Sequence, residues 1–222
     1  MHTRKSVFIS RELNEDSPLR SLGAQVDLIA ESLLEFTSIP FSELPKVDWI
    51  FFYSQQGVQH FFDQCKRSIS EKIAAFGPKT GALLSKKGQK VSFAGNGVAE
   101  DTAKAFSMLC RHEKVLFVRA KNSRKSLQDQ LKDICEINDL VVYDNQPKSQ
   151  INIPTCDLLL FTSPLNARSY YQVYPIDAAQ INVAIGNTTK QALHALGVTE
   201  VYVPEEPTEA SIVQLLKNLF TI

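Results

Sequence analysis

The stretch Phe51-Phe52-Tyr53-Ser54 is followed, 23 positions after its serine, by the turn Gly77-Pro78-Lys79-Thr80. The stretch Leu160-Phe161-Thr162-Ser163 is followed at the same spacing by Gly186-Asn187-Thr188-Thr189, so the second pair repeats the first with a shift of 109 positions. A repeat of this length indicates two similar domains and argues against a solenoid of short units.

A second repeated pair lies upstream of these stretches. The segment Val7-Phe8-Ile9-Ser10-Arg11 matches Val115-Leu116-Phe117-Val118-Arg119, and Leu19 matches Leu127, each with a shift of 108 positions. If the segments at 7–11 and 115–119 are called A, and the segments at 51–80 and 160–189 are called B, the chain has the order A-B-A-B. Two similar domains that face each other form a cleft, and ligand sites are commonly found in clefts between domains.

Short hydrophobic runs alternate along the chain with amphipathic segments. The runs are nearly continuous, which is typical of strands buried on both faces of a sheet. Hydrophobic residues follow helical spacing in two of the intervening segments, 58–65 and 212–219. Strand–helix alternation of this kind predicts the α/β class with parallel sheets. The expected strands are 7–9, 50–52, 73–76, 91–93, 115–118, 140–143, 158–161, 183–185 and 201–203.

Two segments with the composition of connectors, 31–48 and 144–155, each contain two prolines. If the chain crosses between domains at both, its middle forms one domain and its two ends together form the other. If it crosses only at the second, the domains are tandem halves. The repeat alone leaves both arrangements open, because each copy of A can pair with either copy of B.

Composition limits the classes of function. The chain has 222 residues with 24 basic and 24 acidic side chains, so its formal net charge is zero and a general nucleic-acid or membrane-surface binder is not indicated. The four cysteines lie far apart without metal-ligand spacing. Neither a signal peptide nor a membrane-spanning apolar run is evident, so we expect a cytoplasmic, soluble protein.

The turns that follow the expected strands are rich in Ser, Thr, Asn and Gly. Helix capping is one explanation, because these residues satisfy free N–H groups at helix starts. Anion binding by backbone N–H groups and hydroxyls at helix N-termini is the other. Ligands of parallel sheets bind at this carboxyl edge, so the turns suit a ligand with several carboxylates or phosphates. The turns are 54–57, 77–80, 96–97, 121–123, 163–166, 186–189 and 207–208.

Basic residues support an anionic ligand. Arg11 and Arg119 are equivalent in the repeat, and each stands at the end of its expected strand. Lys79 lies in one of the repeated turns, and further basic residues cluster within 121–125. A charged surface facing water is the alternative interpretation.

Motifs for other chemistry are missing. The four histidines are isolated, and His60 and His194 fall within helical segments rather than turns. No cluster of carboxylates is present, and Gly95 and Gly97 lack the third glycine of a dinucleotide-binding fingerprint. We therefore expect no metal, and an enzyme that would work by binding and orientation with modest acid catalysis.

Taken together, these motifs resemble the uroporphyrinogen-III synthase family, and the resemblance covers nearly the whole chain. It rests on the order and spacing of Phe-x-Ser, Gly-Pro-x-Thr and Leu-x-x-x-Gly. These motifs and their partners lie at 52–54, 77–80, 84–88, 116–119, 142–143, 161–164, 186–189 and 207–208.

The resemblance implies two flavodoxin-like α/β domains joined by a two-stranded linker. It favours the double crossing, with one domain built from residues 1–34 and 148–222, a central domain at 37–145, and the active-site cleft between them. The implied reaction cyclises hydroxymethylbilane to uroporphyrinogen III, inverts the terminal pyrrole ring and releases water. This reaction uses no cofactor, and its carboxylate-rich substrate suits the turns described above.

Tyr143 is the catalytic candidate that the resemblance implies. It closes the strand before the second connector, where the family has a tyrosine suited to act as general acid. An aromatic residue that only packs at a strand end is the alternative. The substrate-binding candidates are Arg11, Ser54, Gln56, Gly77, Lys79, Thr80, Arg119, Ser163, Asn166, Gly186, Thr188 and Thr189.

We expect a monomer whose partner is a small linear tetrapyrrole, with transient contact to the preceding enzyme of the pathway, and no nucleic acid or membrane partner. Two other classes stay open. One is a non-catalytic two-domain cytosolic binding protein for a polyanionic small molecule, and the other is a nucleotide- or sugar-phosphate-binding transferase. The missing glycine fingerprint counts against the transferase.

Overall fold

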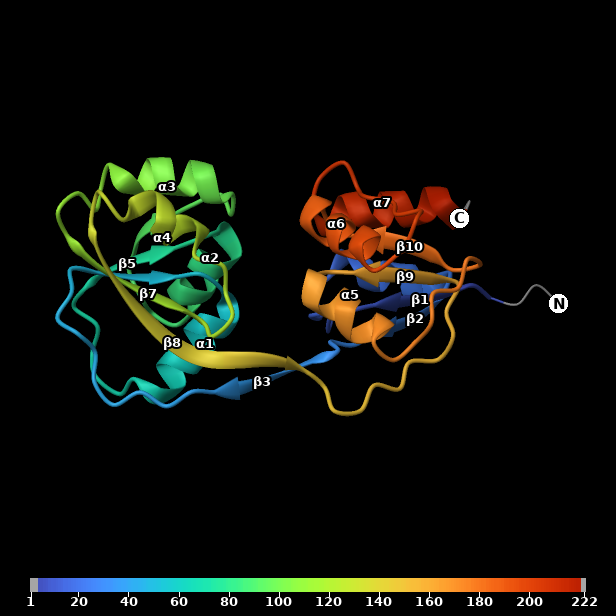
Figure 1. The fold of residues 1–222 in the computed structure, drawn as a ribbon, viewed down its shortest axis with the longest axis horizontal. Helices are drawn as coiled ribbons and strands as arrows, with labels where there is room; N and C mark the ends of the chain where they lie inside the picture. The colour runs from blue at the N-terminus through green and yellow to red at the C-terminus, as the bar shows by residue number, and fades with distance from the viewer. Residues whose placement is uncertain (1–3, 221–222) are drawn as a thin grey trace. The chain divides into compact units, whose positions relative to one another are not determined.

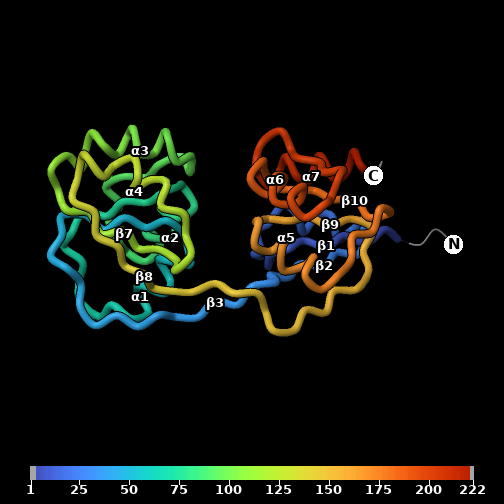
Figure 2. Tube along the Cα trace, in the orientation of Figure 1, coloured from blue at the N-terminus to red at the C-terminus, as the bar shows by residue number. Residues whose placement is uncertain are grey.

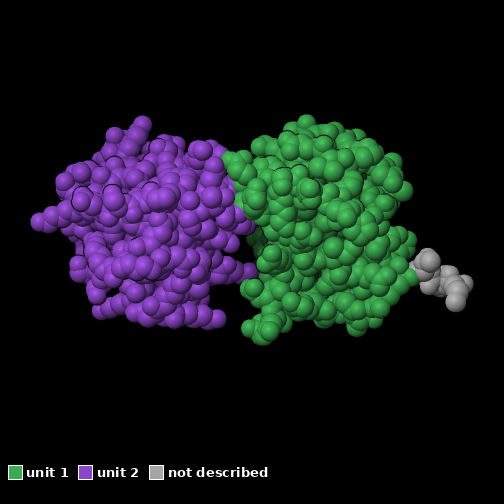
Figure 3. All heavy atoms as spheres, turned by 90° about the horizontal axis from the view of Figure 1, so that it is seen from below, with its two compact units in different colours: residues 1–35, 146–222 green, residues 36–145 purple. Residues whose placement is uncertain are grey.

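A computed structural model describes residues 4–220 of the chain. It divides into two compact units, unit 1 with residues 1–35 and 146–222 and unit 2 with residues 36–145 (Figure 3). Each unit contains a sheet covered by helices, and the pairings between the main strands are parallel. The α/β class and the parallel sheets expected from the sequence are confirmed.

Unit 2 is built on a six-stranded sheet with the order β3-β8-β7-β4-β5-β6. Figure 1 shows β3 beside the end of the long strand β8. Its strands are β3 (Leu34–Ser38), β4 (Trp49–Phe52), β5 (Lys72–Ala75), β6 (Val91–Ala94), β7 (Lys114–Ala120) and β8 (Glu136–Pro147). Its helices are α1 (Gln55–Gln64), α2 (Pro78–Lys86), α3 (Ala99–Ser107) and α4 (Ser126–Leu131).

Alternate side chains of β4 build two cores in unit 2. Trp49 and Phe51 pack with residues of α3 and α4, whereas Ile50 and Phe52 pack with residues of α1 and α2. All four are at most 3% exposed, which explains why this strand has a continuous hydrophobic run rather than an alternating pattern.

Unit 1 is built on a four-stranded sheet with the order β10-β9-β1-β2. Its strands are β1 (Ser6–Ile9), β2 (Asp27–Ala30), β9 (Leu158–Phe161) and β10 (Ile181–Ala184). The 3₁₀ helix η1 (Pro18–Ala24) and α7 (Glu209–Phe220) contribute to one core, and α5 (Pro164–Tyr171) and α6 (Asn187–Ala195) contribute to the other.

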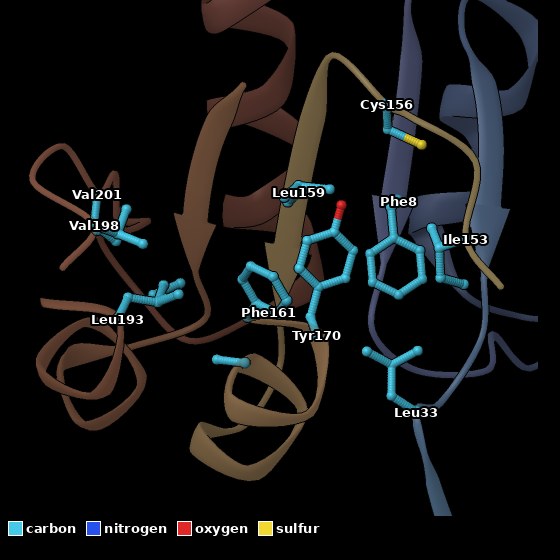
Figure 4. Close-up of a cluster of buried hydrophobic side chains, with 12 residues drawn as sticks. Phe8, Leu33, Ile153, Cys156, Leu159, Phe161, Tyr170, Leu193, Val198 and Val201 are labelled. Atoms are coloured by element: carbon cyan, nitrogen blue, oxygen red, sulfur yellow. The ribbon is translucent and has the colours of Figure 1, made fainter. Parts of the chain in front are cut away.

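The core of unit 1 beneath α5 and α6 is centred on aromatic rings. The Tyr170 ring lies beside Phe8 and Phe161 (Figure 4), with centroid distances of 5.9 Å and 5.5 Å. Leu193 of α6 belongs to the same buried cluster. Aromatic pairs at such distances contribute on the order of 1 kcal/mol beyond the burial of their area.

The repeat in the sequence corresponds to equal strand registers in the two units. In unit 1, β1 pairs with β9 so that Val7 lies opposite Leu158, and in unit 2, β7 pairs with β4 so that Val115 lies opposite Trp49. These four residues are equivalent under the shifts of 108 and 109 positions. The first A segment therefore pairs with the second B segment, and strands from the N-terminal and C-terminal parts of the chain lie in one sheet.

Strand β3 connects the two units together with the end of β8 (Figure 2). Ile39 N donates to Val142 O at 2.9 Å, and Lys148 N donates to Leu33 O at 2.9 Å. Since residue numbers rise along one strand and fall along the other, this ribbon is antiparallel. It is the two-stranded linker that the family resemblance implied.

Three local expectations differ from the structure. The segment 31–48 contains β3 rather than only a connector, and β2 lies directly before it. The expected strand 201–203 is reduced to one isolated bridge between Tyr202 and Val183. β2 is only partly buried and β3 is mostly exposed, so both have a weak hydrophobic pattern, whereas the hydrophobic run 201–203 packs against the cores of unit 1 without forming a full strand.

Candidate active site

Ser54 and Tyr143 meet at the carboxyl edge of the unit 2 sheet. Ser54 caps α1, and its Oγ accepts from Gly57 N at 3.0 Å. The hydroxyl of Tyr143, on β8, lies 3.0 Å from the same Oγ. A serine between a helix start and a strand end therefore holds the phenol by a direct hydrogen bond.

An irregularity in β8 determines which face Tyr143 occupies. Arg119 of β7 lies opposite Val141, but the next residue, Ala120, lies opposite Tyr143, so Val142 is an extra residue in the ladder. Regular alternation would place Tyr143 on the same side as Asp139, which contacts α4. The bulge instead brings Tyr143 into the core beneath α1, and bulges commonly redirect a side chain in this way.

Two aromatic rings border the phenol of Tyr143. The imidazole of His60 stacks on it with centroids 5.2 Å apart and planes 13° apart, and the ring of Phe36 lies at 6.0 Å. Tyr143 is 7% exposed, and burial raises the pKa of its hydroxyl although the Ser54 hydrogen bond opposes the shift. The hydroxyl is therefore protonated at neutral pH and can donate a proton.

The two repeated glycine turns begin helices without a side-chain cap. Gly77 precedes α2 and Gly186 precedes α6, both in extended conformation. Without a capping side chain, the first N–H groups of such helices are suited to an anion. Of the neighbouring predicted residues, Lys79 and Thr188 are exposed and Thr80 and Thr189 are buried.

Ser163 and Asn166 are engaged within unit 1. Ser163 caps α5, and its Oγ accepts from Asn166 N at 3.2 Å and from Asn166 Nδ2 at 3.0 Å. Asn166 is 5% exposed, and its Oδ1 accepts from Leu33 N at 2.9 Å. Asn166 thus connects α5 with the segment before β3. Gln56, a predicted site residue of unit 2, lies in the first turn of α1 and is exposed.

Arg119 is buried in a polar network beneath α4. It is 8% exposed, donates to Asp139 Oδ2 at 3.1 Å and bonds to the carbonyls of Ala120 and Lys121. Its Nε is buried without a hydrogen-bond partner among the described residues. Burial would raise the pKa of Asp139, but Lys125, Arg119 and Gln128 outweigh this effect and lower it. These contacts commit Arg119 to the inside of unit 2.

Arg11 is half-buried at the corresponding strand end of unit 1. It forms an ion pair with Glu209 Oε1 at 2.5 Å, and Ser17 Oγ donates to Glu209 Oε2 at 2.6 Å. The two arginines are thus equivalent in the repeat, but their carboxylate partners come from different elements.

Sequence reasoning missed two neighbours of this edge. His60 seemed isolated because only the fold brings α1 and β8 together. Tyr53 donates to Gln128 Oε1, and burial raises its pKa.

Two hollows in the described part of the chain are bordered by residues of unit 1, and Tyr143 borders neither of them. One, of about 560 Å³, is bordered by Glu12, Arg20 and Leu28, and another, of about 250 Å³, is bordered by Asp157 and Gln180. Within residues 4–220, no group of His, Cys, Asp and Glu side chains could hold a metal ion. No helix among these residues is long and apolar enough to cross a membrane.

Comparison with protein families identifies the chain. The family model described as uroporphyrinogen-III synthase HemD matches residues 16–214, which is most of the sequence. The chain belongs to the uroporphyrinogen-III synthase family. The resemblance seen in the motifs is confirmed, and the chain is an enzyme of tetrapyrrole biosynthesis rather than a binding protein without activity.

Solved structures share the fold of this family member. The uroporphyrinogen-III synthetase of Helicobacter pylori superimposes with a TM-score of 0.78 at 21% identity, covering 98% of this chain and 100% of that one. A mutant uroporphyrinogen III synthase of Thermus thermophilus gives 0.62 at 15% identity, covering 98% and 99%. At these identities the likeness concerns the fold. A search of curated protein sequences gave no significant match.

Proposed function

We propose that the protein converts hydroxymethylbilane to uroporphyrinogen III as a cyclising lyase that needs no cofactor. The observation that carries this proposal is the family match across residues 16–214. The reaction inverts the terminal pyrrole ring and releases one molecule of water. Without an enzyme, the same substrate closes without inversion, so the protein has to favour one route over the other by holding the substrate's shape.

Tyr143 is the residue that we assign to the acid step. Its protonated hydroxyl gives a proton to the departing hydroxyl group of the substrate, which leaves as water and produces a reactive azafulvene in its protonated, cationic form. Attack by the substituted carbon of the terminal ring gives a spiro intermediate, which fragments and closes again with that ring inverted. The proton that the terminal ring loses at the final closure restores the Tyr143 hydroxyl. Acid catalysis of this kind contributes about 10²–10⁴-fold, so most of the remaining rate has to come from orientation.

Ser54 is suited to set the direction of the Tyr143 proton. Its Oγ accepts from Gly57 N at 3.0 Å and lies 3.0 Å from the phenol oxygen. When the serine hydroxyl donates to the phenol oxygen, the phenolic proton is left for a substrate atom. The hydrogen bond thus leaves Tyr143 available as a donor.

We assign carboxylate binding to the turns at the carboxyl edges of the two sheets. The uncapped starts of α2 and α6 support this assignment, because free N–H groups at a helix start favour anions. The half-buried Arg11 adds a positive charge at the unit 1 edge. The residues that we propose for this edge are Arg11, Ser54, Gln56, Gly77, Lys79, Thr80, Arg119, Ser163, Asn166, Gly186, Thr188 and Thr189. Of these, Arg119 supports the edge from inside unit 2, where it is paired with Asp139.

We further propose a cytoplasmic monomer that receives its substrate during transient contact with the enzyme that makes it. A short transfer suits a substrate that otherwise closes by itself to the wrong isomer. Sedimentation of the purified protein, alone and with that enzyme, tests the oligomeric state and the contact.

The activity is tested with freshly made hydroxymethylbilane, after which the products are oxidised and the type I and type III isomers are separated by chromatography. The proposal predicts type III product at a rate proportional to protein concentration. Extensive dialysis against a chelator should leave this rate unchanged, and a loss restored by a metal ion would overturn the assignment of a cofactor-free enzyme.

A further inference from the structure

His60 joins three elements of unit 2 at one point. It lies on α1, its imidazole stacks on the ring of Tyr143 on β8, and its Nδ1 lies 2.7 Å from Ser38 Oγ on β3. The stack is nearly parallel, with centroids 5.2 Å apart and planes 13° apart. The contact with Ser38 fixes the plane of the imidazole, and the imidazole in turn covers one face of the phenol.

This arrangement restricts the motion of the Tyr143 side chain. The phenol oxygen has the hydrogen bond to Ser54 Oγ at 3.0 Å, and a single hydrogen bond allows the ring to swing about it. A ring stacked on a fixed imidazole cannot turn or tilt without losing that contact. Catalytic groups need this kind of support, because a displacement of about 1 Å can reduce the rate on the order of 10²-fold.

We propose that His60 is a positioning residue for Tyr143, which holds the phenol in the orientation needed for proton donation. The proposal rests on the function proposed above, in which Tyr143 is the acid. His60 acts through the tyrosine ring and takes no proton from the substrate. Its ring provides the stacking surface, and its bond to Ser38 connects the linker strand β3 to the site.

Two substitutions distinguish the contribution of the His60 ring from the contribution of its hydrogen bond to Ser38. His60→Gln retains a polar group for Ser38 but removes the ring, and we expect kcat to fall about tenfold with KM nearly unchanged. His60→Phe retains a ring of similar shape, so we expect kcat within about threefold of the wild type. Gln59→Ala, an exposed change on the same helix, is the control and should leave kcat unchanged.

A double-mutant cycle shows whether His60 acts through Tyr143. In a Tyr143→Phe background, His60→Gln should produce little further loss of kcat, because the hydroxyl that His60 positions is already absent. Melting temperatures of all variants are measured in parallel to identify any that fail to fold.

The outcomes are distinct. If the wild-type protein forms no type III isomer, both the proposed function and the proposed role of His60 are wrong. A wild type that forms type III isomer, but whose His60→Gln variant keeps full kcat or loses as much kcat in the Tyr143→Phe background as in the wild type, would overturn the role of His60 alone.

Discussion

The hydroxyl of Tyr143 lies 3.0 Å from Oγ of Ser54, although the two residues are 89 positions apart in the chain. Ser54 belongs to the turn after β4, and Tyr143 lies on β8 two strands away. The contact is formed because the bulge at Val142 turns the tyrosine toward α1. It connects the repeated serine turn with the proposed catalytic acid.

Tyr143→Phe should slow turnover by about 10- to 1000-fold without abolishing it, because orientation of the substrate is retained. The surviving product should still be mainly the type III isomer, and product affinity should change little. Initial rates and isomer ratios on the purified variant test this. Full activity of the variant would show that Tyr143 is not the acid and that orientation of the substrate alone explains the rate.

Ser54→Ala removes both the α1 cap and the partner of the Tyr143 hydroxyl. We expect a loss of stability of about 1 kcal/mol, the usual cost of removing a serine cap, and a lower kcat. The two effects separate in the Tyr143→Phe background, where Ser54→Ala should still lower the melting temperature but no longer lower kcat. An equal fall of kcat in the wild-type and Tyr143→Phe backgrounds would show that Ser54 does not act through Tyr143.

Arg119 and Arg11 should respond differently to replacement by alanine. Arg119 is buried and paired with Asp139, so Arg119→Ala should cost about 2 kcal/mol, which is several degrees in melting temperature. Arg11 has a side chain that is 26% exposed, so Arg11→Ala should cost under about 1 kcal/mol. Thermal unfolding and titration with uroporphyrinogen III measure the two effects.

The binding role of each arginine is read from product affinity. We expect Arg11→Ala to weaken binding while Arg67→Ala, which breaks a surface ion pair with Glu71, leaves affinity unchanged. If Arg119 is structural, the double variant Arg119→Met, Asp139→Asn should regain most of the stability lost by Arg119→Ala. Weakened affinity in that restored variant would instead favour a role for Arg119 in binding.

Asp157 should make unit 1 sensitive to acid. The hydrogen bond from Lys5 is the main cause that lowers the pKa of Asp157 to about 2, and Ser6 N and Oγ donate to the same carboxylate at 2.8 Å and 2.9 Å. In the unfolded chain the pKa is about 3.9. The stabilisation is therefore complete above about pH 4 and is lost as the pH falls through 2.

Denaturant unfolding of the wild type and Asp157→Asn between pH 6 and pH 2 tests this sign. The difference in unfolding free energy should be largest near pH 6 and shrink toward pH 2. If the difference in unfolding free energy between the two proteins stays constant across this range, the charged form of Asp157 is not what stabilises the fold.

The repeat predicted two similar sheets, but it left open which repeated segments pair, and the strand registers come from the structure. Val7 opposite Leu158 and Val115 opposite Trp49 are the same pairing under the repeat, because two sheets with equivalent buried strands have equivalent hydrogen-bond ladders. β3 was not predictable, since four of its five residues are exposed and its pairing depends on main-chain groups. An exposed strand of this kind has no hydrophobic pattern to detect.

Candidate site residues could be proposed from the sequence, but their contacts could not. Tyr143 could be proposed from the family resemblance, but its face depends on one extra residue in β8, which alternation alone would have assigned wrongly. His60 and the partners of Arg119 come from elements distant in the chain. Sequence spacing shows which side chains share an element, whereas contacts between elements depend on how the sheet and helices pack.

The ratio of type III to type I isomer formed from hydroxymethylbilane tests the central claim most directly. The measurement compares buffer alone, wild-type protein and heat-unfolded protein at equal substrate concentration. We predict type I product in buffer and with unfolded protein, and predominantly type III product with the folded protein. The same ratio in all three samples would contradict the account, because a protein that merely binds the substrate would not invert its terminal ring.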